Sequence, residues 1–148
     1  MLQISDKMIE HIKSSGYSGT PLAKKLGIRS GFVIRIINEP TDYFALISAA
    51  PNDIIKTIDR KTKKDFIHYF AKGASELNRD IKQLNKEIQQ NGMIWISWPK
   101  KAAKVETDLD GSIVREIGLK NGLVDVKVCA VNEIWSGLKF VIPINDRK

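Results

Sequence analysis

Short apolar runs alternate along the chain with segments in which apolar residues recur every three or four positions. The runs are β-branched and almost wholly apolar, which is typical of strands that are covered on both faces of a sheet. The expected strands are residues 32–37, 65–70, 93–98, 123–131 and 138–142. Segments with helical spacing separate most of these strands. The alternation of strands and helices predicts an α/β fold.

Helical spacing is clearest in residues 75–90, where buried-type residues step by four, three and four positions and form one apolar stripe. Asn91-Gly92 is expected to close this helix. A second helix is expected to begin at Thr107 or Asp108 and to end at Asn121-Gly122. Three shorter helices are expected at residues 5–15, at 20–27 between the capping Thr20-Pro21 and Gly27, and at 41–50 with Phe44 and Ile47 facing inward.

The lengths of the connections predict the strand directions. Residues 132–137 are too few for a crossover helix, so the last two strands should pair antiparallel. Helices separate the earlier strands, which should therefore be mostly parallel with right-handed crossovers. Residues 54–58 are a weaker candidate strand, because residues 60–64 are short for a parallel return. This segment is either not a strand or lies at an edge of the sheet.

These elements predict a Rossmann-like three-layer sandwich, with a mostly parallel sheet that ends in a C-terminal antiparallel hairpin. The chain has 148 residues, which suits a single domain with its own hydrophobic core. We expect residues 1–148 to form that domain, with residues 1–31 as a helical N-terminal extension packed on the sheet.

Composition narrows the class of protein. Apolar residues make up 43% of the chain, but no run approaches the roughly 18–20 residues that span a bilayer. The N-terminus lacks the pattern of a secretory signal, and the single Cys129 can form neither an internal disulfide nor a multi-thiolate metal site. A cytoplasmic protein without membrane attachment is expected. The net charge of +7 suits a nucleic acid, nucleotide or phosphate partner, or equally a solvated basic surface.

From residue 66 onward the order is strand, helix, strand, helix and antiparallel hairpin, which resembles the second half of the methyltransferase version of the Rossmann fold. That resemblance implies a glycine-rich turn after the first strand, where the backbone approaches the cofactor. Residues 38–43 contain no glycine, and Pro40 lacks a backbone donor. Asp59 stands about where a ribose-binding acid would be, although a turn role is the simpler interpretation. No cofactor is therefore implied by the residues.

Several unusual sequence motifs carry a second, closer resemblance that covers nearly the whole chain. They are Gly16-Tyr17-Ser18-Gly19-Thr20-Pro21-Leu22, Trp98-Pro99-Lys100-Lys101, and residues 124–131 followed by Trp135-Ser136-Gly137-Leu138-Lys139. Their order is similar to that in a bacterial domain family of unknown function. The resemblance implies a small bacterial cytoplasmic protein and supplies no catalytic residue.

Candidate binding residues cluster where expected strands end. Trp98, Lys100 and Lys101 follow a central strand, where open α/β sheets usually bind ligands, and the two lysines suit a phosphate or carboxylate. Packing of Trp98 on the core rim is the alternative. Asn38 ends the first strand at the same edge, as a hydrogen-bonding group or simply a turn residue.

Two loops supply the remaining candidates. Trp135 is expected in the loop of the last hairpin, where Gly137 would supply a positive φ, and packing explains Trp135 equally well. Tyr17 and Ser18 precede a capped helix whose N-terminus can bind an anion, although a plain helix cap needs no ligand.

The sequence favours three functions in a definite order. The first is a non-catalytic domain that binds a small anionic ligand or a protein partner at this rim. The second is a nucleic-acid-binding protein, and the third is a diverged S-adenosylmethionine-dependent methyltransferase. His11 and His68 are isolated, and neither a nucleophile elbow nor a spaced metal-ligand pair occurs, so hydrolytic and metal-dependent chemistry are disfavoured.

Overall fold

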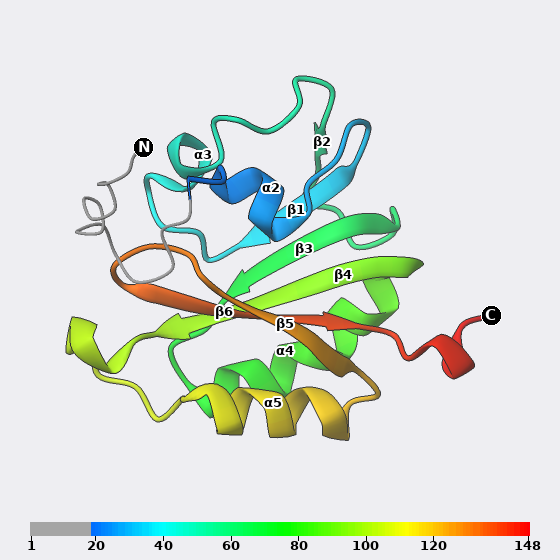
Figure 1. Cartoon of the computed structure of the whole chain (residues 1–148). Coiled ribbons are helices and arrows are strands. Elements are labelled where there is room, and N and C mark those ends of the chain that lie inside the picture. The colour runs from blue at the N-terminus through cyan, green and yellow to red at the C-terminus, as the bar shows by residue number, and fades with distance from the viewer. Residues whose placement is uncertain (1–18) are drawn as a thin grey trace.

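The computed structural model describes residues 19–148, which form a single six-stranded sheet with helices on both faces (Figure 1). The strands are β1 (Val33–Ile37), β2 (Ile55–Lys56), β3 (Lys64–Phe70), β4 (Ile88–Pro99), β5 (Val124–Ala130) and β6 (Trp135–Val141). The helices are α2 (Leu22–Leu26), α3 (Tyr43–Leu46), α4 (Ala74–Glu87) and α5 (Gly111–Lys120), with single 3-10 turns η1 (Lys101–Ala103) and η2 (Ile144–Asp146). The helix expected at residues 5–15 lies outside the described residues.

The strand order is β2-β1-β3-β4-β6-β5. Strands β2, β1, β3 and β4 are mutually parallel, whereas β6 runs antiparallel to both β4 and β5. The predicted α/β class, the mostly parallel sheet and the terminal antiparallel hairpin are therefore confirmed. From β1 the chain moves to β2 on one side and then returns to β3 on the other. The strand order thus reverses between β1 and β3, and ligands of open α/β sheets bind beyond the carboxyl ends of strands at such a point.

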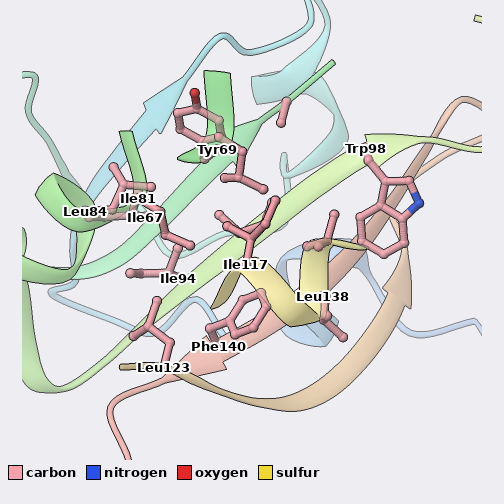
Figure 2. Packing of buried hydrophobic residues seen from close by; sticks show 14 of the residues in the cluster. Ile67, Tyr69, Ile81, Leu84, Ile94, Trp98, Ile117, Leu123, Leu138 and Phe140 are labelled. Atoms are coloured by element: carbon pink, nitrogen blue, oxygen red, sulfur yellow. The ribbon is translucent and has the colours of Figure 1, made fainter. Parts of the chain in front are cut away.

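Helices α4 and α5 cover one face of the sheet, below it in the view of Figure 1, and α2 and α3 lie on the other. Figure 2 shows the larger core, where Leu138 and Phe140 of β6 lie close to Ile117 of α5. The α5 backbone comes so close to this core that a Cβ on Gly118 would overlap the Phe140 ring. A residue without a side chain is therefore what seats α5 on the sheet.

Helix α4 ends three residues earlier than its apolar stripe predicts. The stripe includes Ile88, which is buried but is the first residue of β4 and pairs with Lys64. The next paired residue is Met93, opposite Phe66, so the residues between them form a bulge rather than a helix end. Burial explains the error, because the buried Ile88 continues the helical spacing although its backbone is extended.

The start of α5 also differs from expectation, because the two residues expected to cap it bond to another element. Helix α5 begins after Asp110, whose carboxylate accepts a hydrogen bond from the Ile113 amide at 2.9 Å. Asp108 instead accepts from the amide of Ala74, the first residue of α4, at 2.8 Å. Thr107 donates to the carbonyl of Lys72, just before α4, at 2.5 Å. These two residues therefore hold the start of α4 and not that of α5.

The final hairpin turns earlier than expected. Asn132 accepts hydrogen bonds from the amides of Ile134 and Trp135, and β6 begins at Trp135. Gly137 is consequently a strand residue, and its φ is not positive. Glycine is needed there for space, because a Cβ would stand 3.1 Å from the Trp95 ring.

The segment after β1 is shorter than expected and turns a different residue inward. Helix α3 has four residues, and Tyr43 is fully buried whereas Phe44 is 38% exposed. The expectation for Ile47 is confirmed, since it is buried. Strand β2 has two residues at the edge of the sheet, opposite the amino-terminal end of β1. Its position explains how so short a connection can return to β3.

A buried ionic cluster fixes the amino-terminal edge of the sheet, where β3 starts and α4 ends. The carboxylate of Glu87 is fully buried and lies 2.7 Å from the Arg35 guanidinium on β1 and 2.9 Å from the Lys64 ammonium on β3. Gln83 also donates to it at 3.0 Å. Burial pushes the pKa of Glu87 upward, but the hydrogen bonds from Arg35, Lys64 and Gln83 outweigh burial and hold its pKa below the ordinary value. Glu87 is therefore a carboxylate at neutral pH.

Replacing Glu87 with Gln should cost about 3–5 kcal/mol of unfolding free energy, because the buried ammonium of Lys64 would lose its counter-charge. Chemical denaturation monitored by circular dichroism measures this. The matched control is Glu116→Gln, which removes an exposed carboxylate from α5 and should change stability by less than about 0.5 kcal/mol. Equal effects of the two variants would contradict the role assigned to Glu87.

Candidate functional site

A hollow of about 310 Å³ lies at the carboxyl edge of the sheet, beside the point where the strand order reverses. We call it the carboxyl-edge hollow. Its lining residues come from the end of β1, the end of β3, the start of α4 and the start of β6: Asn38, Glu39, Pro40, Phe70, Lys72, Glu76 and Trp135. The hollow therefore occupies the position at which an open α/β sheet is expected to bind a ligand.

Asn38 closes the end of β1 toward β3. Its φ of 58° is in the left-handed region, which asparagine tolerates better than most residues do. In this conformation its side-chain amide donates a hydrogen bond to the carbonyl of Phe70 at 3.3 Å. The side chain thus bridges the carboxyl ends of the two strands between which the order reverses.

Aromatic rings pack side by side at the end of β3 and the start of β6. Trp135 meets the Phe70 ring edge-on, with 5.0 Å between the ring centroids. Phe70 in turn stacks on the His68 ring at 4.3 Å. Trp135 is 8% exposed and Phe70 2% exposed, so they form a nearly closed apolar wall of the hollow.

Behind this wall, three polar side chains form a buried hydrogen-bonded chain. The Tyr43 hydroxyl lies 2.9 Å from Nδ1 of His68, and the Ser97 hydroxyl lies 2.8 Å from Nε2. Burial lowers the pKa of His68 to about 3, so the imidazole is neutral and has one donor and one acceptor nitrogen for its two hydroxyl partners. Burial likewise raises the pKa of Tyr43. Ser97 has no exposed surface, so this chain of hydrogen bonds satisfies polar groups in the core and does not present a nucleophile.

The charged residues lining the carboxyl-edge hollow are Glu39, Glu76 and Lys72. Two carboxylates against one ammonium give the lining a net charge of −1. Glu76 also accepts a hydrogen bond from the backbone amide of Lys72 at 3.2 Å. The sign of this lining favours a cationic or zwitterionic group over an anion.

The structure brings together two of the residues proposed from the sequence, Asn38 and Trp135, in this hollow. Trp98 lies on the opposite face of the sheet, 9% exposed, within the core under α5 (Figure 2). Lys100 and Lys101 follow it at the start of η1 and do not line the hollow. Tyr17 and Ser18 lie outside the described residues. The rim proposed from the sequence is thus divided between the two faces of the sheet.

Five lining residues were not proposed from the sequence: Glu39, Pro40, Phe70, Lys72 and Glu76. Phe70 ends an expected strand, as Asn38 does, so the rule for the carboxyl ends of parallel strands applies equally to both. The missing information was that β1 and β3 are neighbours. With β2 uncertain, the position of the reversal in strand order could not be assigned.

Asp59, the candidate ribose-binding acid, is engaged in its own turn. Its carboxylate accepts hydrogen bonds from the amides of Thr62 at 2.7 Å and Lys61 at 2.9 Å and from the Thr57 hydroxyl at 2.9 Å. These bonds hold the pKa of Asp59 below its ordinary value, and the bond from the Thr62 amide has the largest effect. Its carbonyl accepts from the ammonium of Lys64, the first residue of β3, which is the end opposite the hollow. The turn role is therefore the one that the structure supports.

Several solved structures share this architecture at low sequence identity. A SAM-dependent methyltransferase from Aquifex aeolicus superposes with a TM-score of 0.57 at 13% identity, over 96% of this chain and 100% of that one. The ribosomal protein L11 methylase from Lactobacillus delbrueckii subsp. bulgaricus gives 0.56 at 11% identity, over 82% and 74% of the two chains. Magnesium protoporphyrin IX methyltransferase from Synechocystis PCC 6803, solved with bound SAM, gives 0.53 at 11%, over 81% and 74%.

These matches show a methyltransferase-like Rossmann fold. No protein-family model and no curated protein matches the chain, so the likeness is one of fold alone. The similarity to a bacterial family of unknown function stays a prediction.

The carboxyl edge does not fit S-adenosylmethionine in the manner of a glycine-cradled cofactor. Such a cradle needs a turn after the first strand in which the backbone can approach the ligand closely. Here Asn38 places its side chain across that position, and Pro40 offers no amide hydrogen. Asp59, the acid proposed for the ribose, is held in its turn at the far edge.

Within residues 19–148, no group of three or more His, Cys, Asp or Glu side chains is placed to hold a metal ion. No helix in the same range has the length and apolar character to cross a bilayer.

The buried His68 makes stability depend on pH. Its folded pKa of about 3 lies below the ordinary value, so the unfolded chain binds more protons between about pH 6.5 and pH 3. The contribution of His68 to the unfolding free energy is therefore fully present above pH 6.5. It should be lost at up to about 1.4 kcal/mol per pH unit as the pH drops through this window. Urea unfolding at pH 7, 6 and 5 measures the slope. His68→Asn should flatten it, and an unchanged slope in that variant would contradict the assignment.

Proposed function

We propose that this chain is a non-catalytic binding domain on a methyltransferase-like scaffold, and that its carboxyl-edge hollow takes a small ligand with a positive charge. One observation carries the proposal: the side chain of Asn38 bridges β1 and β3 in place of an open glycine-rich turn. The scaffold therefore has a hollow at the edge where open α/β sheets bind ligands. It lacks the open glycine-rich turn that would hold a cofactor there.

The chemistry of the lining supports a cationic ligand. Glu39 and Glu76 supply two carboxylates, and the indole of Trp135 lies at the same hollow. Carboxylates and aromatic rings are the groups that stabilise a bound ammonium or sulfonium group. The volume of about 310 Å³ lies at the lower end of ligand pockets, which favours a compact ligand. The lysine-rich motif at Lys100 and Lys101 suggested an anionic ligand, but those residues lie outside this hollow.

Among the described residues next to the carboxyl-edge hollow, the hydroxyl and imidazole groups are inaccessible, which supports binding rather than catalysis. The hydroxyls of Tyr43 and Ser97 and the imidazole of His68 are fully buried behind the aromatic wall. Burial raises the pKa of the Cys129 thiol, which favours its unreactive protonated form. Among the lining side chains the charged groups are Glu39, Lys72 and Glu76, which can hold a ligand by charge and hydrogen bonds.

A diverged S-adenosylmethionine-dependent methyltransferase is the second candidate. The observation that favours it is the likeness in fold to methyltransferases, one of which was solved with SAM bound. The two candidates differ in what they require of the ligand. A cofactor site must also hold the product S-adenosylhomocysteine, which lacks the sulfonium charge, whereas a cation site needs the charge.

Calorimetric titration with choline, S-adenosylmethionine, S-adenosylhomocysteine and ADP separates the two candidates. The proposal predicts weak binding of choline and S-adenosylmethionine, at least tenfold weaker binding of S-adenosylhomocysteine, which keeps only the ammonium of its amino-acid zwitterion, and none of ADP. Glu39→Gln should weaken binding roughly two- to fivefold, because it removes one exposed counter-charge. Glu116→Gln on α5 is the control and should leave binding unchanged.

Binding of S-adenosylhomocysteine as tight as that of S-adenosylmethionine would favour the methyltransferase instead. A lack of binding by both cations would overturn the proposed cation site.

A further inference from the structure

A second and larger hollow, of about 530 Å³, lies at the opposite edge of the sheet. We call it the amino-edge hollow. It is formed where α4 and α5 end, where β4 and β5 begin, and where the chain leaves β6 near the C-terminus (Figure 1). Its lining is polar and contains no aromatic side chain.

Positive charge is concentrated at this hollow. Lys63, Lys82, Lys86 and Lys148 line it, with Asp146 as the one acid in the lining. Four ammonium groups against one carboxylate give a net of +3, compared with +7 for the whole chain. The carboxyl-edge hollow has a lining of opposite sign, so the basic character of the protein is not spread evenly over its two edges.

Helix dipoles do not account for all of these lysines. Cations are favourable near helix C-termini, because the last carbonyls of a helix lack partners within it. Here Lys63 donates to the Lys86 carbonyl at 2.6 Å, and Asn85 donates to the Asn121 carbonyl at 2.9 Å. The side chain of Asn121 donates in turn to the carbonyl of Ile117 at 2.8 Å. One lysine and two neutral amides therefore satisfy three carbonyls at these helix ends.

Three ammonium groups remain without a partner in the described part of the chain, those of Lys82, Lys86 and Lys148. Lys82 and Lys86 are exposed and stand one helical turn apart on α4, so their side chains are neighbours. Neighbouring exposed lysines repel each other unless an anion lies between them. Their juxtaposition indicates a ligand with several closely spaced negative charges.

We infer that the amino-edge hollow binds closely spaced phosphates through Lys82, Lys86 and Lys148. Lysine holds a phosphate as a point charge, without the planar geometry that arginine imposes. With no aromatic ring in the lining, bases have nothing on which to stack, so contact is made to phosphates alone. The source is either the backbone of a nucleic acid or a small polyphosphate. This site is independent of the cation site at the other edge.

Fluorescence anisotropy with a labelled single-stranded oligonucleotide, and competition by inorganic tripolyphosphate, test the inference at low salt. The double variant Lys82→Gln with Lys86→Gln should lower oligonucleotide affinity at least tenfold. It should also reduce the slope of log affinity against log salt by roughly 1–2. The control, Lys24→Gln with Lys101→Gln, removes the same charge from exposed residues outside the hollow and should lower affinity less than threefold.

The tripolyphosphate arm identifies the source of the phosphates. Displacement of the oligonucleotide by tripolyphosphate, lost in the hollow variant, assigns a small polyphosphate to the site. Oligonucleotide binding that tripolyphosphate does not displace assigns a nucleic-acid backbone. Equal losses in the two double variants would show a general charge effect and overturn the inference, as would the absence of binding by both probes.

Discussion

The buried carboxylate of Glu87 is the interaction on which the arrangement of the sheet depends. It is the last residue of α4, and β4 begins at the next residue, so no loop can absorb a displacement between helix and strand. Arg35 from β1 and Lys64 from β3 both meet this carboxylate. One side chain thereby fixes three parallel strands and a helix at the amino edge. Because desolvated charges demand good geometry, the cluster tolerates little variation in how these elements meet.

The carboxyl edge of the sheet is held together differently. There, in place of an ionic cluster, the Asn38 side chain reaches from β1 to β3, and Trp135 packs on Phe70. The result is a methyltransferase-like fold in which the Asn38 side chain bridges the ends of β1 and β3, with an acidic hollow beside it. At the other edge, Lys63 and two amides satisfy helix carbonyls, and the ammonium groups of Lys82, Lys86 and Lys148 have no partner among residues 19–148. The two hollows therefore differ in charge for identifiable structural reasons.

Sequence patterns were sufficient for the class of fold, the parallel half and the terminal hairpin, because strand periodicity and connection length are local properties. Element ends were less predictable where burial imitates helical spacing, as at Ile88, or where a cap serves another element, as Asp108 does. The candidate site was predicted in part. Asn38 and Trp135 end or begin strands at the hollow, whereas Trp98 turned out to face the other side of the sheet. That outcome depends on strand order and face, which no single segment of the sequence encodes.

A small cationic ligand at the carboxyl-edge hollow can be detected directly, because the three tryptophans lie at different places around the sheet. Trp95 donates its indole N–H to the Leu26 carbonyl at 2.8 Å within the core, and Trp98 lies under α5. Trp135 alone of the three lines the hollow. The most direct measurement is the NMR spectrum of the indole N–H groups during titration with choline. We expect a saturable shift of the Trp135 signal while those of Trp95 and Trp98 stay in place. A shift of Trp98 without Trp135, or no shift at all, would contradict the proposed cation site.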